Sequence, residues 1–268
     1  MSFSRLLVKV NQHLFGKKGT GKLDGVRPDD TFIVSYPKSG NTWLRHMLSV
    51  LITHDSAIKL EQMDCLVPDL NIVSKNFLDS LPPPRIMKSH TILTSQYKRI
   101  IYLVRDPRDV AVSLWHHQRR AFMKSEQELP WDVFWRGFIS DGSWRDHVGG
   151  WLGARDNHDD FMLIKYEDLK VDTCKILKMI AGHCGLSVSD SDIEKAYLSS
   201  SIEKLRAKER AERKKWEESK YSDSNMNFFR RGAIGDGKEL FTAEQLVDLE
   251  KNCGPLMLKL GYQLNNRE

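Results

Sequence analysis

The side chains best suited to chemistry lie close together in the segment Lys38–Trp43 (KSGNTW), which combines a cation, three hydrogen-bonding side chains and a glycine. The segment separates a β-branched and aromatic stretch, Thr31–Val34, from Asn41–Ser49, whose apolar residues have helical spacing. A helix that begins directly after a strand presents unpaired backbone N–H groups and the positive end of its dipole to the loop. Because anions bind at such helix starts, the segment predicts a phosphate-binding loop formed by Lys38, Ser39, Gly40, Asn41 and Thr42.

This loop is not a Walker loop, since Lys38 precedes the glycine instead of following it. An ordinary strand–turn–helix with a lysine in its turn is the alternative. We favour the phosphate-binding interpretation because Lys, Ser, Asn, Thr and Trp all fall within Lys38–Trp43.

A second anion site is indicated by Arg105, which follows the apolar stretch Arg99–Val104 (RIIYLV). In open parallel sheets, ligands bind at the carboxyl ends of the strands. Ser113 lies about two helical turns further on, near the same crevice. Arg105 could instead form an ion pair with Asp106 or Asp109, and the residues alone leave both interpretations open.

A basic loop with three glycines, Phe228–Lys238 (FFRRGAIGDGK), occurs late in the chain. The glycines permit close backbone approach and positive φ angles, and the forked donors of Arg230 and Arg231 suit phosphate. Alone, such a loop is weak evidence. Together with the loop at Lys38 and with Arg105, it predicts a ligand that carries phosphates at two separate points.

His90 is the candidate general base, because a neutral histidine can accept a proton from a hydroxyl group. It follows Arg85–Lys88 (RIMK), which we expect to be a short strand. Lys88 would point to the same side of the extended chain as His90. A single histidine after a strand is more often structural, and the pairing with Lys88 is what favours a catalytic site.

Strands alternate with helices along the chain, which is typical of βαβ units. The pattern predicts an α/β protein: one domain with a central parallel sheet flanked by helices on both faces. We expect residues 1–25 to form an N-terminal amphipathic helix and linker, and residues 26–268 to form the domain. The expected elements beyond those above are a strand at Phe161–Tyr166, a helix after Pro107, a helix over Glu167–Cys184, and helices opened by capping boxes at Ser191 and Thr242.

The composition limits the classes of function. Lys and Arg number 41 against 36 acidic residues, a net charge of +5, which suits a polyanionic small molecule and is too weak to indicate nucleic acid. The four cysteines form no CxxC pair and have no histidine at zinc spacing, so we expect free thiols and no metal. No apolar run is long enough to span a membrane, and we expect a cytoplasmic protein without a membrane partner.

The segment Glu203–Lys220 is densely charged. A solvated helix is the simpler interpretation. A mobile cover over a ligand site is the second, and nucleic-acid binding is a distant third.

Five motifs, in order, resemble those of the soluble, cytosolic-type sulfotransferases that use 3′-phosphoadenosine 5′-phosphosulfate (PAPS). The resemblance extends from about Phe32 to Lys238 and implies a P-loop-like three-layer α/β sandwich. It also implies PAPS as sulfuryl donor, adenosine 3′,5′-bisphosphate (PAP) as product, and no metal. The motifs are YPKSGNTW at Tyr36–Trp43, KSH at Lys88–His90, YLVRDPRDVAVS at Tyr102–Ser113, YEDL at Tyr166–Leu169 and FFRRGAIGDGK at Phe228–Lys238.

The resemblance also implies roles for individual residues. The segment Lys38 to Thr42 would hold the 5′-phosphosulfate, Trp43 would stack on the adenine, Tyr166 would reach the adenine, and Ser200 would be a further nucleotide contact. The catalytic groups would be His90 as base, Lys38 at the leaving oxygen, and Lys88. The 3′-phosphate would bind to Arg105, Ser113, Arg230, Arg231 and Gly232.

The acceptor would be a hydroxyl or amine of a small molecule, and its identity cannot be read from the sequence. Phe77, Phe134, Trp135 and Phe138 hint at an apolar acceptor, although such residues more often belong to the core. The family's C-terminal pairing motif is incomplete here, so we expect a monomer or a weak homodimer.

The sequence departs from the family at two further positions: Gly237 replaces a tryptophan of the basic loop, and Ile202 replaces an aromatic residue near the adenine. Two other functions remain open. One is a nucleotide-dependent small-molecule kinase, which the missing Walker pattern disfavours. The other is a non-catalytic nucleotide-binding protein.

Overall fold

The structure, a computed structural model, describes residues 25–70, 73–123, 128–140, 143–216, 227–235 and 238–265. The predicted N-terminal helix and most of its linker lie outside these residues. Within these residues, the sheet consists of four parallel strands in the order β2-β1-β3-β4. Their bounds are Thr31–Val34 for β1, Ile86–Ser89 for β2, Arg99–Val104 for β3 and Phe161–Lys165 for β4.

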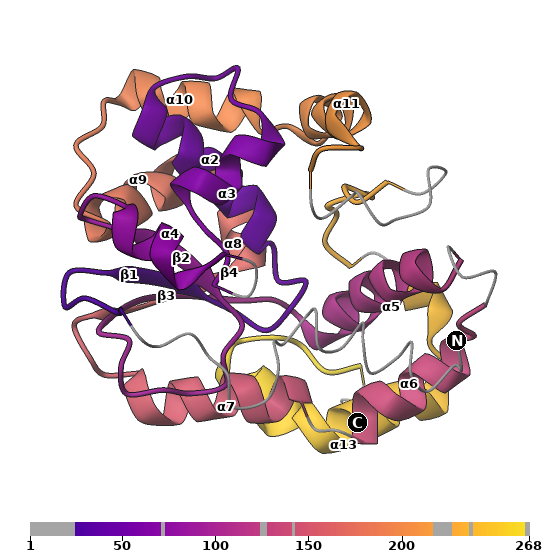
Figure 1. Ribbon diagram of the computed structural model, residues 1–268. Coiled ribbons are helices and arrows are strands. Elements are labelled where there is room, and N and C mark those ends of the chain that lie inside the picture. Colours follow the sequence, from indigo (N-terminus) through magenta and orange to yellow (C-terminus); the bar gives the residue numbers. More distant parts are fainter. Residues whose placement is uncertain are drawn as a thin grey trace.

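Helices connect and cover the strands (Figure 1). Among the described residues, none of them has both the length and the apolar character needed to cross a bilayer. The helices are α2 (Asn41–Thr53), α3 (Leu60–Leu66), α4 (Lys75–Ser80), α5 (Pro107–Met123), α6 (Trp131–Ser140), α7 (Ser143–Arg155), α8 (Tyr166–Val171), α9 (Thr173–His183), α10 (Asp190–Ser199), α11 (Ile202–Glu212), the short 3₁₀ turn η1 (Lys238–Leu240) and α13 (Ala243–Lys259).

Two layers of helices enclose the sheet. Alternate residues of a strand point to opposite faces, so Phe32 and Val34 of β1 pack with α5, α6, α7 and α13. Ile33 packs on the other face with α2, α9 and α10. Figure 1 shows these groups of helices on either side of the strands. The predicted three-layer α/β fold with a parallel sheet is therefore confirmed.

The connections change direction at β1. Strands β2 and β3 lie on its two sides, helix α2 leaves β1 toward one face of the sheet, and α5 leaves β3 toward the other. The loops that follow neighbouring strands therefore diverge, which opens a crevice at the carboxyl ends of the strands. The loop Ser35–Gly40 and Arg105 both lie at this edge.

Two local predictions were wrong. The predicted helix Glu167–Cys184 is two helices, α8 and α9, because Asp172 leaves the helical conformation and its side chain caps α9. The predicted cap Ser191 lies inside α10. Ser189 is the actual cap: its hydroxyl accepts from the Asp192 N–H, and the Asp192 carboxylate accepts from the Ser189 N–H. By contrast, the capping box at Thr242 is confirmed.

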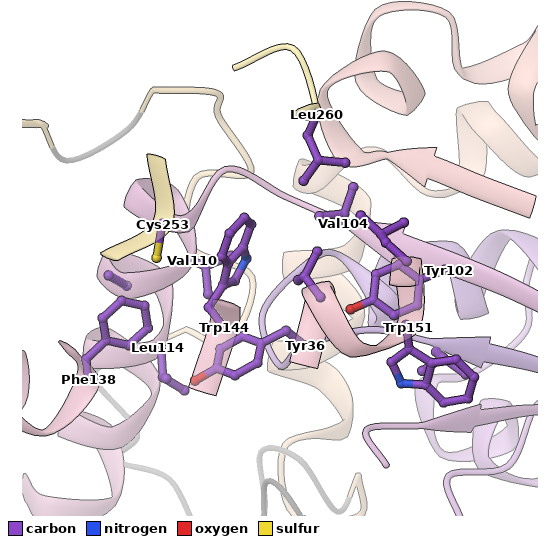
Figure 2. Packing of buried hydrophobic residues seen from close by; sticks show 14 of the residues in the cluster. Tyr36, Tyr102, Val104, Val110, Leu114, Phe138, Trp144, Trp151, Cys253 and Leu260 are labelled. Atoms are coloured by element: carbon purple, nitrogen blue, oxygen red, sulfur yellow. The ribbon is translucent and has the colours of Figure 1, made fainter. Parts of the chain in front are cut away.

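The loop after β1 rests on a densely packed core. Tyr36 is 2% exposed, and Figure 2 shows its side chain among those of Leu114, Phe138 and Trp144. The rings of Tyr36 and Phe138 meet edge to face at 6.5 Å between centroids. The indole N–H of Trp144 donates to the carbonyl of Arg105 at 3.2 Å. The same cluster therefore supports the ends of both β1 and β3.

A buried ion pair joins the starts of two strands. Arg85, just before β2, donates from Nε to Asp30 Oδ1 at 2.7 Å and from its terminal nitrogen to Oδ2 at 2.6 Å. The Asp30 and Arg85 side chains are 0% and 1% exposed. The guanidinium also donates to the carbonyls of Gly25 and Leu78. These contacts fix the register of β1 and β2 away from the crevice.

Candidate functional site

The loop between β1 and α2 has the backbone geometry of an anion-binding turn. Lys38 (φ 70°) and Gly40 (φ 101°) both adopt left-handed conformations, which are uncommon for a lysine and occur at ligand-binding turns. Helix α2 begins at Asn41 without a side-chain cap and without an acidic residue in its first turn. Its first N–H groups and its positive dipole end are therefore left for an anion.

Gly40 is also confined by its neighbour Tyr166. A Cβ at position 40 would lie 2.5 Å from Cδ2 of the Tyr166 ring, and the backbone conformation is unfavourable for any other residue. We expect the backbone strain in Gly40→Ala to lower the free energy of unfolding by about 1–3 kcal/mol. The clash of the new Cβ with the ring should add to this loss and displace Tyr166. Urea unfolding measures this loss.

Gly182→Ala in α9 is the matched control, since a Cβ there would meet nothing within 4 Å. Alanine is the better helix former, so this variant should keep or slightly increase stability. Equal stability of the two variants would contradict the close contact between Gly40 and Tyr166.

His90 follows β2 and is held in one tautomer. Its Nδ1–H donates to the backbone carbonyl of Ser35 at 2.7 Å, and a carbonyl can only accept. The Nε2 atom therefore carries the lone pair. Burial, reinforced by the charge of Lys88, lowers the pKa of His90 well below its usual value of 6.5, so the imidazole is neutral at pH 7.

Lys88, two residues earlier, is paired with a residue that the sequence did not indicate. The ammonium of Lys88 donates to the carboxylate of Asp69, and both side chains are buried. Burial alone would raise the pKa of Asp69, but the charges of Lys88 and Arg45 and the hydrogen bond from Lys88 lower it to about 2. Asp69 therefore stays ionised and keeps the Lys88 ammonium beside His90.

Arg105 connects the crevice to the basic loop. Of the two ion pairs that the sequence offered as alternatives, with Asp106 or with Asp109, the one with Asp109 is present. Its guanidinium lies 3.4 Å from Asp109 Oδ2, while Asp106 pairs with Arg108 instead. The same guanidinium donates to the Ala233 carbonyl at 2.9 Å and lies over the Tyr166 ring. Its buried Nε has no hydrogen-bond partner in the part of the chain that the structure describes, so the side chain retains a donor for a ligand.

The basic loop is anchored at the crevice by its backbone. The hydroxyl of Tyr166 donates to the Gly232 carbonyl at 3.0 Å, and the Gly235 N–H donates to Asp109 at 2.9 Å. The carboxylate of Glu209 in α11 accepts from two further loop N–H groups. These contacts hold Arg230 and Arg231 beside the phosphate-binding loop, although far apart in sequence.

Trp43 in α2 is fixed beside α10. Its indole N–H donates to the Ser200 carbonyl at 3.0 Å, and its ring meets that of Tyr166 edge to face. The Ser200 hydroxyl donates to the Ala196 carbonyl and accepts from Nδ1 of His46 at 2.7 Å. Burial, with the nearby charge of Lys208, lowers the pKa of His46 to about 3, which keeps this interhelical link neutral.

One cavity of about 360 Å³ gathers these side chains. Ser39 is the exception among the predicted site residues: it is fully buried, and its hydroxyl donates to the Tyr36 carbonyl. The cavity is lined by all the others, namely Lys38, Gly40, Asn41, Thr42, Trp43, Lys88, His90, Arg105, Ser113, Tyr166, Ser200, Arg230, Arg231 and Gly232.

Several lining residues were missed by sequence reasoning. Lys170 lies one helical turn after Tyr166, and its ammonium is 4.9 Å from the centroid of the Trp43 ring. The spacing of one helical turn from Tyr166 could have placed Lys170 at the cavity from the sequence. Tyr197 and Leu198 are exposed hydrophobic residues at the cavity, which periodicity could not reveal. Ile202, where the family has an aromatic residue, also lines it.

The remaining expectations have mixed outcomes. Phe134, Trp135 and Phe138 pack in the core against α5 and α13, and they line neither of the two cavities at the crevice.

The charged segment begins as α11, whose Leu205 and Glu209 are buried, so it is not simply a solvated helix. Residues 217–220 and Gly237 lie outside the described residues. Within the described part of the chain, no group of His, Cys, Asp and Glu side chains could hold a metal ion.

Comparisons with known proteins give one consistent result. The model of the sulfotransferase domain family matches residues 28–261. Mouse sulfotransferase 2B1 is 31% identical, over 82% of this chain and 69% of its own length. Flavonol 3-sulfotransferase of Flaveria bidentis is 31% identical, over 84% of this chain and 80% of its own. The crystal structure of mouse sulfotransferase SULT7A1 complexed with PAP has a TM-score of 0.66 and 28% identity, covering 89% of this chain and 90% of that one.

Proposed function

Because the chain belongs to the sulfotransferase domain family, we propose that it transfers a sulfuryl group from PAPS to a hydroxyl or amine of a small molecule. The observation that carries the proposal is the single cavity in which Lys38, His90 and Arg105 meet the basic loop. The PAP bound to mouse SULT7A1 and the flavonol acceptor named for the Flaveria relative support the donor and the acceptor class.

The proposed donor position follows the charges of the cavity. The 5′-phosphosulfate lies at Lys38 and the first N–H groups of α2, and Ser39 contributes only its backbone. The adenine lies at Trp43, Tyr166 and Ser200. The buried Nε of Arg105, which has no hydrogen-bond partner among the described residues, suits a phosphate oxygen. The 3′-phosphate binds to Arg105, Ser113, Arg230, Arg231 and Gly232.

The proposed reaction is an in-line transfer. His90 Nε2 takes the proton of the acceptor hydroxyl as the new bond from oxygen to sulfur forms. The bond from sulfur to the 5′-phosphate oxygen breaks, and Lys38 stabilises the negative charge that grows on that oxygen. Lys88 stabilises the sulfuryl oxygens, and its contact with the Asp69 carboxylate holds it in place. The products are the sulfated acceptor and PAP.

The donor site can be tested directly by isothermal titration calorimetry with PAP. We expect tight binding without magnesium, followed by transfer of label from ³⁵S-PAPS in a screen of phenols, alcohols and amines. Magnesium-dependent binding of ATP, with no affinity for PAP, would favour the kinase alternative. PAP binding without transfer to any acceptor would favour the non-catalytic alternative.

Lys38→Ala should weaken PAP binding and also reduce the transfer rate, because the ammonium faces the 5′-phosphate before and during the reaction. We expect PAP affinity to fall about tenfold or more, the usual effect of losing one charge-assisted hydrogen bond. Titration calorimetry and single-turnover transfer measure the two effects separately. Lys178→Ala, at an exposed ion pair on α9, is the control. A change in stability alone would remove Lys38 from this role.

A further inference from the structure

One face of α7 carries three ring N–H groups that donate to backbone carbonyls at the edge of the crevice. Residues three and four apart lie on one face of a helix, and the three donors have this spacing. The donors are Trp144, His147 and Trp151, and their ring nitrogens lie 3.2, 3.2 and 3.0 Å from the carbonyl oxygens of Arg105, His90 and Thr91, respectively. Helix α7 therefore holds the backbone at the candidate base as well as at Arg105.

His90 needs this support because it lies beyond the paired part of its strand. The register of β2 with β1 ends at Ser89, so the sheet does not fix the orientation of the peptide that follows. The ring of His90 is held at Nδ1 by the Ser35 carbonyl. A single hydrogen bond leaves a side chain free to pivot about it, whereas a second one to the backbone of the same residue removes that freedom. The bond from His147 supplies the second.

The hydrogen bond from His147 has only one possible direction. A carbonyl can only accept, so Nε2 of His147 carries the proton and Nδ1 carries the lone pair. The hydroxyl of Tyr102 in β3 donates to this Nδ1 at 2.8 Å. Burial lowers the pKa of His147 to about 4, so the ring is neutral at pH 7 and keeps this arrangement. Tyr102 therefore selects the tautomer that can hold His90.

His147 does not reach a substrate itself. It is 2% exposed, it lines neither of the two cavities at the crevice, and both of its ring nitrogens are used inside the protein. Its ring also meets the ring of Tyr36 edge to face at 5.9 Å between centroids. Figure 2 shows Tyr102 close to Trp151 of the same helix face, with 6.2 Å between the ring centroids. The imidazole is thus confined by aromatic rings as well as by its hydrogen bonds.

We propose that His147, oriented by Tyr102, is a positioning residue: it holds the backbone of His90 so that Nε2 of His90 faces the acceptor hydroxyl. The inference rests on the proposed function, in which His90 takes the proton of that hydroxyl. A displacement of about 1 Å at a reacting group can slow a reaction about 100-fold. PAP affinity should not depend on His147, because its hydrogen bonds go to Tyr102 and His90, and neither of these is proposed to bind the donor.

The test compares two amides in place of the imidazole, with ³⁵S-PAPS and the best phenol of the acceptor screen as substrates. In His147→Gln the amide N–H can occupy the position of Nε2–H and donate to the His90 carbonyl. In His147→Asn the shorter side chain places its amide near the position of Nδ1, from which it cannot reach that carbonyl. We expect His147→Asn to lower kcat by about 10–100-fold and His147→Gln to stay within about threefold of normal. Acceptor KM and PAP affinity should stay within about threefold of normal in both variants.

Tyr102→Phe and an NMR measurement carry the test if neither amide variant folds. This substitution keeps an aromatic ring in the core and removes only the donor to Nδ1 of His147, so kcat should fall about three- to tenfold. In protein labelled with ¹⁵N-histidine, the imidazole nitrogen signals show which nitrogen carries the proton. We expect Nε2–H for His147 and Nδ1–H for His90 in the unchanged protein. A proton on Nδ1 of His147 would overturn the inference.

The control is Arg145→Gln, at an exposed position on the same helix, which should leave kcat and PAP affinity unchanged. Equal kcat in the two amide variants, normal kcat in Tyr102→Phe, or a parallel loss of PAP affinity in His147→Asn would contradict the positioning role. If the unchanged protein transfers no label to any acceptor, or if His90→Ala transfers normally, the proposed function fails instead, and the positioning role fails with it.

Discussion

His90→Ala should lower the transfer rate by about 10²–10⁴-fold while PAP affinity changes little, because removal of a general base has effects of this size. The structure already holds the imidazole in the form that the role requires. Its Nδ1–H is committed to the Ser35 carbonyl, and burial keeps the ring neutral. The measurements are single-turnover transfer from ³⁵S-PAPS and calorimetry with PAP.

His158→Ala, which removes an exposed histidine before β4, is the control and should transfer at the normal rate. The pH dependence gives a second test. Because the pKa of His90 is lowered, the ring stays neutral as the pH falls through 6.5, and activity should be lost only at lower pH. Turnover within about threefold of normal in His90→Ala, or an acid limb above pH 6.5, would be incompatible with the proposed base.

Asp30→Ala should cost about 3–5 kcal/mol of folding free energy, one of the largest effects available to a single substitution here. The substitution leaves the Arg85 guanidinium buried with only the Gly25 and Leu78 carbonyls as acceptors. An arginine side chain stays protonated in proteins, so the buried cation cannot be relieved by losing its proton. Chemical denaturation monitored by tryptophan fluorescence measures the loss.

The control is Lys178→Ala, which breaks the exposed pair with Asp190. Exposed pairs contribute little, since water and salt screen them, so this variant should unfold almost as the unchanged protein does. PAP affinity of any folded Asp30→Ala protein should be normal because the pair lies away from the crevice. Similar stability of the two variants would mean that the Asp30–Arg85 pair does not anchor the strands.

Much of the site could be predicted because its chemistry is local in sequence. The loop from Lys38 to Thr42 follows a strand and starts a helix, so its backbone donors could be read from the residues alone. Arg105 could be placed by the rule that ligands bind at the carboxyl ends of parallel strands. The placement of the basic loop needed the resemblance, since nothing local brings Arg230 to Lys38.

What could not be predicted depends on contacts between distant segments. Asp69 pairs with Lys88 through an irregular loop that no periodicity describes. Ser39 looked like a ligand contact, but its hydroxyl is used inside the loop. A second cavity at the crevice, of about 300 Å³, combines residues of α5 with Arg206 of α11 and the basic loop. The wrong cap arose because two serine–acid pairs with the same spacing overlap, Ser189 with Asp192 and Ser191 with Glu194, and the helix uses the first pair.

Helices α2 and α5 leave the sheet toward opposite faces. We therefore expect the rate of the proposed transfer to be sensitive to sliding of one helical layer relative to the other. Lys38 precedes α2, which packs in one helical layer, and Arg105 precedes α5, which packs in the other. A substitution in either interior that slides a layer along the strands would change the spacing of these two cations without replacing either of them. Interiors are close-packed and transmit such strain, so mutations far from the crevice should alter turnover before they alter the fold.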